Sequence, residues 1–405
     1  MTVNLEAPDK LLPVRGVRLA ACASGIKKKP ITDLVLIELS NDANCSAVFT
    51  QNRFRAAPVI IAEKNLAISS PKLLMINSGN ANAGTGETGF NDAVTTCEYA
   101  ATALGCDTNQ VLPFSTGVIG ESLPTRCFEE ALPGLVDALE TDAWLTAAQG
   151  IMTTDTVAKG FSKQFEIDGV TVTLTGIAKG SGMIKPNMAT MLSYIATDAN
   201  IHRGLLSDCL KSSVELSFNS ITVDGDTSTN DSCVLIATGQ SGAAEINTKD
   251  HRYNTFMIAL NEAMKYLAQA IVRDAEGVTK FVEVKVLNAQ SYQDAKTVAY
   301  TVAHSPLVKT ALFASDPNWG RILAAVGRAE IDSLDIDKLA IYLDDVCIVS
   351  KGGRDKSYIE TAGQQVMSKA EILITIDLSA GHDHASVWTS DLSYDYVKIN
   401  AEYRT

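Results

Sequence analysis

The sequence has few of the features that mark a nucleic-acid-binding protein. Of its 405 residues, only 34 are lysine or arginine against 47 aspartates and glutamates, which gives a formal net charge of −13 at pH 7. This charge argues against nucleic acid as a partner, because binding phosphates requires clustered cations. The one basic run, residues 27–29, stands before a proline and is most simply a solvated turn.

Long apolar runs are also missing. No stretch approaches the roughly 18 consecutive apolar residues that a membrane-spanning helix requires. Charged residues and two prolines interrupt residues 1–16, where a signal peptide would need an apolar core. We therefore expect a protein of the cytoplasm that has no membrane segment and is not secreted.

Metal-binding patterns are equally scarce. The eight cysteines are scattered without a CxxC pair, which argues against both a zinc site and a dense disulfide framework. The tempting run His382-Asp383-His384 follows a glycine in an expected loop and has no third ligand at a recognised spacing. The sequence predicts no metal site.

Two further motifs match a ligand-binding pattern only in part. Residues 84–89 fit GxGxxG, but residues 77–83 separate them from the expected strand, and no strand-ending acid follows about twenty residues later. Residues 224–235 begin like a calcium loop, yet they lack the glycine and the final glutamate of that motif. We expect no nicotinamide cofactor and no calcium, and we expect Asp224 and Asp226 to organise a turn.

The apolar residues that are present predict a mixed α/β protein with a substantial core, since 46% of the chain is hydrophobic. Apolar residues at helical spacing predict a long helix over residues 256–271, and alternating isoleucines predict a strand over residues 372–376. Other strands are expected at residues 33–39, 73–76, 171–175, 233–237 and 280–287, and other helices near residues 91–104, 129–140 and 205–216. No repeat or flexible linker marks a domain boundary.

The most informative segment is residues 179–198, where a loop rich in glycine and proline becomes an apolar strand at Thr190. If the bond between Ala189 and Thr190 were cut, Thr190 would carry a hydroxyl and a free α-amine. Such an amine has a pKa of roughly 7.7 to 8, so it can accept the hydroxyl proton near neutral pH. The alternative is that Thr190 only opens a strand, where β-branched residues are favoured.

Residues 179–192, KGSGMIKPNMATML, resemble the self-cleavage signature of the ornithine acetyltransferase family, also called glutamate N-acetyltransferase or bifunctional arginine biosynthesis protein. Other segments that are similar to family motifs follow in order at residues 47–59, 76–86, 113–121, 152–156, 217–232, 272–284, 305–322 and 395–405. Because these segments span nearly the whole chain, the resemblance does not depend on any one of them.

The resemblance implies an α/β sandwich of helices and sheets like that of N-terminal-nucleophile enzymes. It implies self-cleavage into chains of residues 1–189 and 190–405, with two copies of each in a heterotetramer. The implied reaction is a ping-pong transfer of the acetyl group from N2-acetylornithine to glutamate through an acetyl-Thr190 intermediate. No cofactor is implied, and acetyl-coenzyme A enters only as a second acetyl donor that some relatives accept.

The resemblance also assigns the site residues. Thr190 would be the nucleophile, and Thr116 with Gly117 would form the oxyanion hole. The implied substrate contacts are Thr153, Lys179, Thr190, Glu276, Asn400 and Thr405. From the residues themselves we expect Lys179 to lie in a glycine-rich loop and Glu276 to close the long helix before Gly277. The contacts that the resemblance implies for Asn400 and Thr405 would require the carboxyl end to fold back into the site.

Two other functions remain open. An amidohydrolase or aminopeptidase would pass the same acyl group to water, so only the acceptor would distinguish it. A small-molecule binding protein would keep Thr190 inside one intact chain and would show no turnover.

Overall fold

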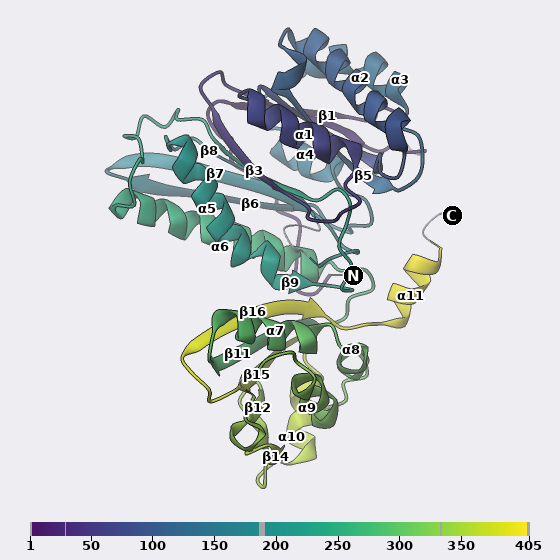
Figure 1. Cartoon of the computed structure of the whole chain (residues 1–405). Helices are drawn as coiled ribbons and strands as arrows, with labels where there is room; N and C mark the ends of the chain where they lie inside the picture. The colour runs from purple at the N-terminus through teal and green to yellow at the C-terminus, as the bar shows by residue number, and fades with distance from the viewer. Residues whose placement is uncertain (1, 29, 186–190, 333, 403–405) are drawn as a thin grey trace.

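The computed structural model describes residues 2–28, 30–185, 191–332 and 334–402. It has two lobes, a larger one that contains the first strands and ends with α6, and a smaller one built around β11 and β16 (Figure 1). Helices and strands alternate through both lobes, which confirms the predicted mixed α/β class.

In the described part of the larger lobe, two sheets pack face to face. The first has the order β1 (Val17–Cys22), β2 (Leu34–Leu39), β4 (Leu73–Asn80) and β5 (Val111–Val118). The second has the order β3 (Asn44–Phe49), β10 (Ser232–Ala237), β8 (Leu192–Thr197), β7 (Val170–Lys179) and β6 (Lys159–Ile167). Apolar side chains of both sheets meet between them, where the Phe114 and Tyr194 rings lie edge to face with centroids 5.3 Å apart.

Helices cover the outer faces of both sheets, which gives four layers. The first sheet is covered by α1 (Ala57–Ile68), α2 (Gly86–Leu104) and α3 (Thr125–Asp137), and the second by α5 (Arg203–Glu215) and α6 (His251–Arg273). The short helix α4 (Trp144–Gly150) contributes to the core between the sheets. The apolar stripe of α6 is buried, and each such side chain contributes about 1.5 to 3 kcal/mol.

The smaller lobe contains a third sheet with helices packed on it. Its order is β14 (Gly353–Arg354), β13 (Val346–Ser350), β12 (Ala340–Leu343), β15 (Glu371–Asp377), β11 (Phe281–Ala289), β16 (Asp383–Ser390) and β9 (Ile221–Thr222). The helices are α7 (Tyr292–Ala303), α8 (Pro306–Phe313), α9 (Trp319–Gly327) and α10 (Glu360–Met367). Three short 3₁₀ helices occur among the described residues, η1 (Thr108–Gln110), η2 (Phe218–Ser220) and η3 (Ile336–Lys338).

Two segments join the lobes. Strand β9 belongs to the chain between α5 and β10, yet it pairs with β16 of the third sheet. The last helix, α11 (Tyr394–Ala401), leaves β16 and runs back toward the larger lobe (Figure 1). Helix α11 contributes Asn400 to the pocket described below.

The expected strands and helices are present, and four local expectations are wrong. Helix α6 ends at Arg273, where the next residue, Asp274, forms an ion pair with Lys159. Glu276 therefore lies beyond the helix and does not close it. Lys179 ends strand β7, where it pairs with Leu192, and is not in a loop. Strand β4 continues to Asn80, so fewer residues than expected separate it from the GxGxxG match at residues 84–89. Asp383 and His384 belong to strand β16 and are not in a loop.

Lys27 is also not simply solvated, because the carbonyls of Thr32 and Met152 accept hydrogen bonds from its ammonium group. All eight cysteines are free thiols. Across the described ranges, no helix is both long and apolar enough to cross a bilayer.

Candidate active site

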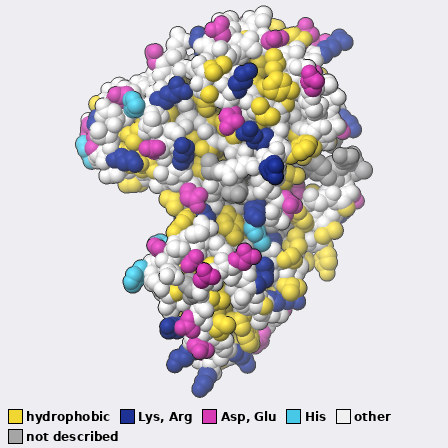
Figure 2. All heavy atoms as spheres, viewed as in Figure 1, with side chains coloured by type: hydrophobic (Ala, Val, Ile, Leu, Met, Phe, Trp, Pro, Cys, Tyr) yellow, Lys and Arg dark blue, Asp and Glu magenta, His cyan; other side chains and the backbone are white. Residues whose placement is uncertain are grey.

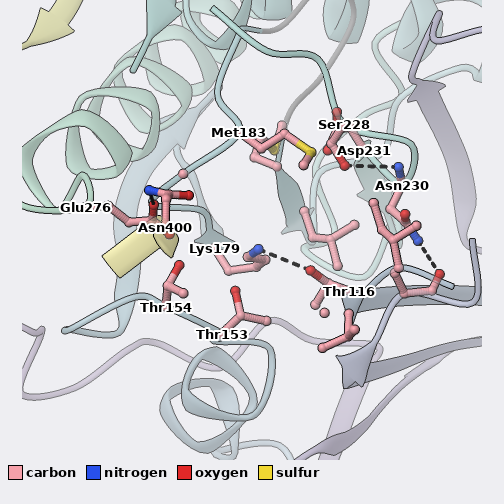
Figure 3. Close-up of a pocket in the computed structure, with 17 residues that line it drawn as sticks. Thr116, Thr153, Thr154, Lys179, Met183, Ser228, Asn230, Asp231, Glu276 and Asn400 are labelled. Atoms are coloured by element: carbon pink, nitrogen blue, oxygen red, sulfur yellow. Dashed lines mark hydrogen bonds between the residues drawn. The ribbon is translucent and has the colours of Figure 1, made fainter. Parts of the chain in front are cut away.

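A pocket of about 280 Å³ lies where the larger lobe meets the start of the 180–185 segment and the last helix (Figure 3). Its lining comes from segments far apart in sequence: Ala81, Thr116, Gly117, Val118, Ile119, Thr153, Thr154, Lys179, Gly182, Met183, Met191, Leu192, Ser228, Asn230, Asp231, Glu276 and Asn400. Polar side chains from several of these segments converge on it.

One side of the pocket is the end of β5. Gly117 has a φ of 135°, and a Cβ there would lie 2.3 Å from the backbone carbon of Gly79, so only glycine fits. The Asn230 amide donates to the carbonyls of Ala81, at 2.6 Å, and Ser115, at 2.9 Å. These bonds fix the backbone around Thr116 before any substrate binds.

Lys179 extends from the end of β7 to Thr116. Its Nζ donates to Thr116 Oγ1 at 3.1 Å. An ammonium group cannot accept a hydrogen bond, so the Thr116 hydroxyl keeps its own hydrogen for another acceptor. Burial lowers the pKa of Lys179, and the carboxylates of Asp155 and Asp231 oppose that effect.

A buried charge cluster lies behind Lys179. Lys159 contacts Asp155 and Asp274 at 2.6 Å each, and these side chains are almost completely inaccessible. Asp155 also accepts from the N–H of Gly180 at 2.7 Å. Burial alone would raise the pKa of Asp155, but the ammonium groups of Lys159 and Lys179 hold it below its ordinary value.

The opposite side of the pocket carries a carboxylate. Glu276 is held through its N–H, which donates to the Ser181 carbonyl at 3.0 Å. Gly182 allows the Glu276 carboxylate to approach, since a Cβ there would lie 2.5 Å from it. Asn400 of α11 donates to Glu276 Oε2 at 2.8 Å, so helix α11 reaches the pocket.

Comparison with known proteins places the chain in a family. The ArgJ family model matches residues 18–405. The chain belongs to the ArgJ family. The arginine biosynthesis bifunctional protein ArgJ of Pseudomonas syringae pv. tomato is 52% identical, and that of Pseudomonas fluorescens 51%, with all of both chains covered. The crystal structure of the Bacillus halodurans protein of the same name is 36% identical and covers 50% of this chain and 95% of its own, with a TM-score of 0.49.

In this ArgJ family chain, the pocket brings together most of the site residues predicted from the sequence. They are Thr116, Gly117, Thr153, Lys179, Glu276 and Asn400. Their roles stay predictions. Ala189, Thr190 and Thr405 lie outside the described residues. Met191, the first described residue after them, lines the same pocket.

Sequence reasoning considered Ser228 only as part of the rejected calcium-loop pattern, and it did not single out Asn230 or Asp231. The available signal was a run of polar residues directly before the apolar strand β10, within one of the family-like segments. The expected turn at Asp224 is confirmed, because its carboxylate accepts from the N–H of Asp226 at 3.2 Å. It also accepts from Met183 and Ile184, which holds the segment leading to the proposed cleavage site.

The pocket therefore offers an oriented hydroxyl donor, a buried ammonium and a carboxylate on opposite sides. An amino acid that carries both a carboxylate and an amine is the complementary ligand. Among the described residues, no group of three or more His, Cys, Asp or Glu side chains is arranged to hold a metal ion.

Proposed function

We propose that the chain transfers the acetyl group from N2-acetylornithine to glutamate through an acetyl-Thr190 intermediate, after cleavage between Ala189 and Thr190. As a member of the ArgJ family, it is an acetyltransferase of arginine biosynthesis that acts on small-molecule substrates. The proposal concerns the route of transfer and the residues that carry it.

The observation that carries the proposal is the contact between Lys179 and Thr116 inside the pocket. Acyl transfer passes through a tetrahedral intermediate whose oxyanion needs donors already in place. The Thr116 hydroxyl accepts from Lys179 and so has its hydrogen free to donate to that oxyanion. Gly117 completes this side as the second predicted donor.

In the first half-reaction, the Thr190 hydroxyl attacks the acetyl carbonyl while the Thr190 α-amine takes its proton. The amide bond then breaks, the proton passes to the departing nitrogen, and ornithine leaves. In the second, the amine of glutamate attacks the acetyl ester, and the proton returns to the Thr190 oxygen. We propose that Thr153, Lys179, Glu276, Asn400 and Thr405 contact the substrates, with Lys179 facing a carboxylate and Glu276 an amine.

The test is the intact mass of the purified protein under denaturing conditions, beside Thr190→Ala and the control Thr102→Ala, which alters an exposed threonine of α2. We expect two fragments, residues 1–189 and 190–405, in the wild type and the control, and one uncut chain in Thr190→Ala. A folded but uncut wild type would contradict the mechanism and favour a binding protein.

The acceptor then needs its own assay. With N2-acetylornithine as donor, we expect N-acetylglutamate to form at the rate at which ornithine appears. Release of acetate, with no effect of added glutamate, would instead indicate a hydrolase.

Three further proposals are separate. The relatives' name, bifunctional protein, supports acetyl-coenzyme A as a second donor, which thiol release in the presence of glutamate would test. A heterotetramer of two copies of each chain is tested by light scattering of the native protein. The cytoplasmic location stays a prediction.

A further inference from the structure

We propose that Lys27 is a positioning residue for acetyl transfer, which holds the segment that carries Thr153 against the pocket. This inference rests on the proposed function. Lys27 does not line the pocket, and nothing in its position in the sequence predicted a role in acetyl transfer. Its contacts connect it to two sides of the pocket.

The ammonium group of Lys27 holds the backbone next to Thr153. Its Nζ donates to the carbonyl of Met152 at 2.9 Å and to the carbonyl of Thr32 at 3.2 Å. Within the same segment, the N–H of Thr153 donates to Asp155 Oδ2 at 3.0 Å. The backbone that presents Thr153 is therefore held by Lys27 on one side and by Asp155 on the other.

The backbone of Lys27 is itself firmly fixed. Its N–H donates to Asp33 Oδ2 at 2.8 Å. Asp33 is fully buried and also accepts from the N–H of Ser24 at 2.6 Å and from its hydroxyl at 2.8 Å. Because both ends of the Lys27 side chain are fixed, a displacement of the Met152 carbonyl would break a hydrogen bond.

The methylene stem of Lys27 packs on the strand behind the predicted oxyanion hole. A Cβ on Gly79 would lie 2.9 Å from Lys27 Cγ, so the stem occupies the space that this glycine leaves. Gly79 pairs with Gly117 across β4 and β5. The stem of Lys27 thus packs on Gly79, the strand partner of Gly117, while its ammonium group binds the backbone beside Thr153.

Lys27 also affects the charge of the pocket. Burial lowers the pKa of Lys27, the carboxylates of Asp33 and Asp155 oppose this, and the Lys179 ammonium lowers it further. Since that repulsion is mutual, removal of the Lys27 charge should make Lys179 easier to protonate. The other charged groups that act on Lys179 are Asp155, Asp231, Lys159 and Glu276, and they stay in place.

The experiment compares Lys27→Met, which keeps a stem and removes the ammonium, with Lys28→Met, the adjacent exposed lysine. Both are assayed for acetyl transfer from N2-acetylornithine to glutamate, and rates are divided by the cleaved fraction from intact mass. We expect kcat/KM to fall about 10-fold to 100-fold in Lys27→Met, as misplacement of a substrate-positioning segment does. We expect Lys28→Met to match the wild type.

Two readouts separate positioning from general damage to the fold. In the Thr153→Ala background, Lys27→Met should lower kcat/KM by no more than about twofold, because the segment it positions has lost its contact group. The pH at which activity declines on the alkaline side should be higher in Lys27→Met than in Lys28→Met, because the repulsion between the Lys27 and Lys179 ammonium groups is gone.

A Lys27→Met enzyme with kcat/KM within twofold of Lys28→Met would overturn the inference while leaving the proposed function intact. The inference would also be overturned if Lys27→Met lowered kcat/KM by the same factor in the Thr153→Ala background as in the wild type. If Lys27→Met does not fold, Lys27→Gln is judged by the same criteria. A folded, cleaved wild type without acetyl transfer would remove the proposed function, and the inference with it.

Discussion

Thr116 shows how a single residue depends on its neighbours for its proposed chemistry. In the proposed reaction its hydroxyl can donate to the oxyanion because Lys179 occupies its acceptor side and cannot accept in return. Burial of Lys179 disfavours its charged form, and the carboxylates around it oppose this effect and favour the ammonium form. Donor and ammonium therefore act together.

We predict that Thr116→Val lowers kcat for acetyl transfer by about 10² to 10³, or roughly 3 to 4 kcal/mol, as loss of one oxyanion donor does. Valine keeps the shape of threonine and removes only the hydroxyl, so folding should be preserved. The control is Thr154→Val in the same pocket, for which we expect a loss of less than about tenfold. Steady-state kinetics on cleaved protein checks both, and equal losses would argue against a donor role for Thr116.

His304 should make the stability of the protein sensitive to acid. Burial, with the nearby cations Lys185, Lys309 and Arg328, lowers the pKa of His304 to about 4. The unfolded chain takes up that proton near pH 6.5, so the stabilising effect is complete above pH 6.5 and is lost as the pH falls toward 4. The loss amounts to roughly 3 kcal/mol at most.

The matching variant is His304→Gln, which can still bond to Thr222 Oγ1, the hydroxyl that His304 contacts at 3.0 Å. Urea unfolding at pH 7 and at pH 4.5 should show a smaller loss of stability on acidification in this variant than in the wild type. His251→Gln, at an exposed histidine, should behave like the wild type. Identical acid sensitivity in all three proteins would refute the assignment.

At the scale of elements, the end of α6 is connected to the pocket through Asp274. Its carboxylate binds Lys159 of β6 and the backbone N–H of Thr156, while its carbonyl accepts from the Ser181 hydroxyl. The helix, a strand and two loops thus converge on one buried cluster of Asp155, Lys159 and Asp274. Such a cluster is costly to disrupt because the charges that remain stay buried with fewer partners.

Asp274→Asn should therefore lower the free energy of unfolding by about 1.5 to 3 kcal/mol, the contribution of hydrogen bonds to a charged group, because Lys159 keeps Asp155 as a partner. The control is Glu130→Gln, which breaks the exposed pair with Arg126 on α3 and should cause no measurable change, because solvent screens that pair. Denaturant unfolding measures both. A stability of Asp274→Asn equal to that of Glu130→Gln would show that the cluster does not stabilise the fold.

The elements themselves could largely be predicted, because their signals are local. The apolar stripe of α6 and the alternating isoleucines of β15 follow from helix and strand periods, and both elements are present. The ends of elements could not be predicted. Helix α6 stops where Asp274 meets Lys159, which lies 115 residues away in sequence, so no local pattern contains that information.

At the scale of the whole molecule, local sequence patterns predict even less about the site than about the ends of elements. Thr116 and Lys179 lie 63 residues apart, and Glu276 and Asn400 lie 124 apart, so only the fold brings them into one pocket. Family resemblance supplied these residues, whereas their spacing gave no sign of a common site. Asn230 and Lys27 went unrecognised because each acts through backbone carbonyls, which any donor of suitable length can bind.

The two sides of the proposed cleavage site are joined by a sheet. Strand β7 precedes the site and β8 follows it, and they pair in antiparallel register from Lys179 with Leu192 to Leu174 with Thr197. Strand β8 pairs with β10, and β10 with β3 from the first part of the chain. The core between the two sheets of the larger lobe also contains residues from both parts.

A cut between Ala189 and Thr190 should therefore leave the fragments bound to each other, because separating them would expose this core and the edges of both strands. We predict that they elute together on native size exclusion, at the same volume as uncut Thr190→Ala, and separate only in denaturant. Fragments that separate in native buffer would mean that the chain needs the intact bond to hold its sheets together, contrary to the extent of the contacts across it.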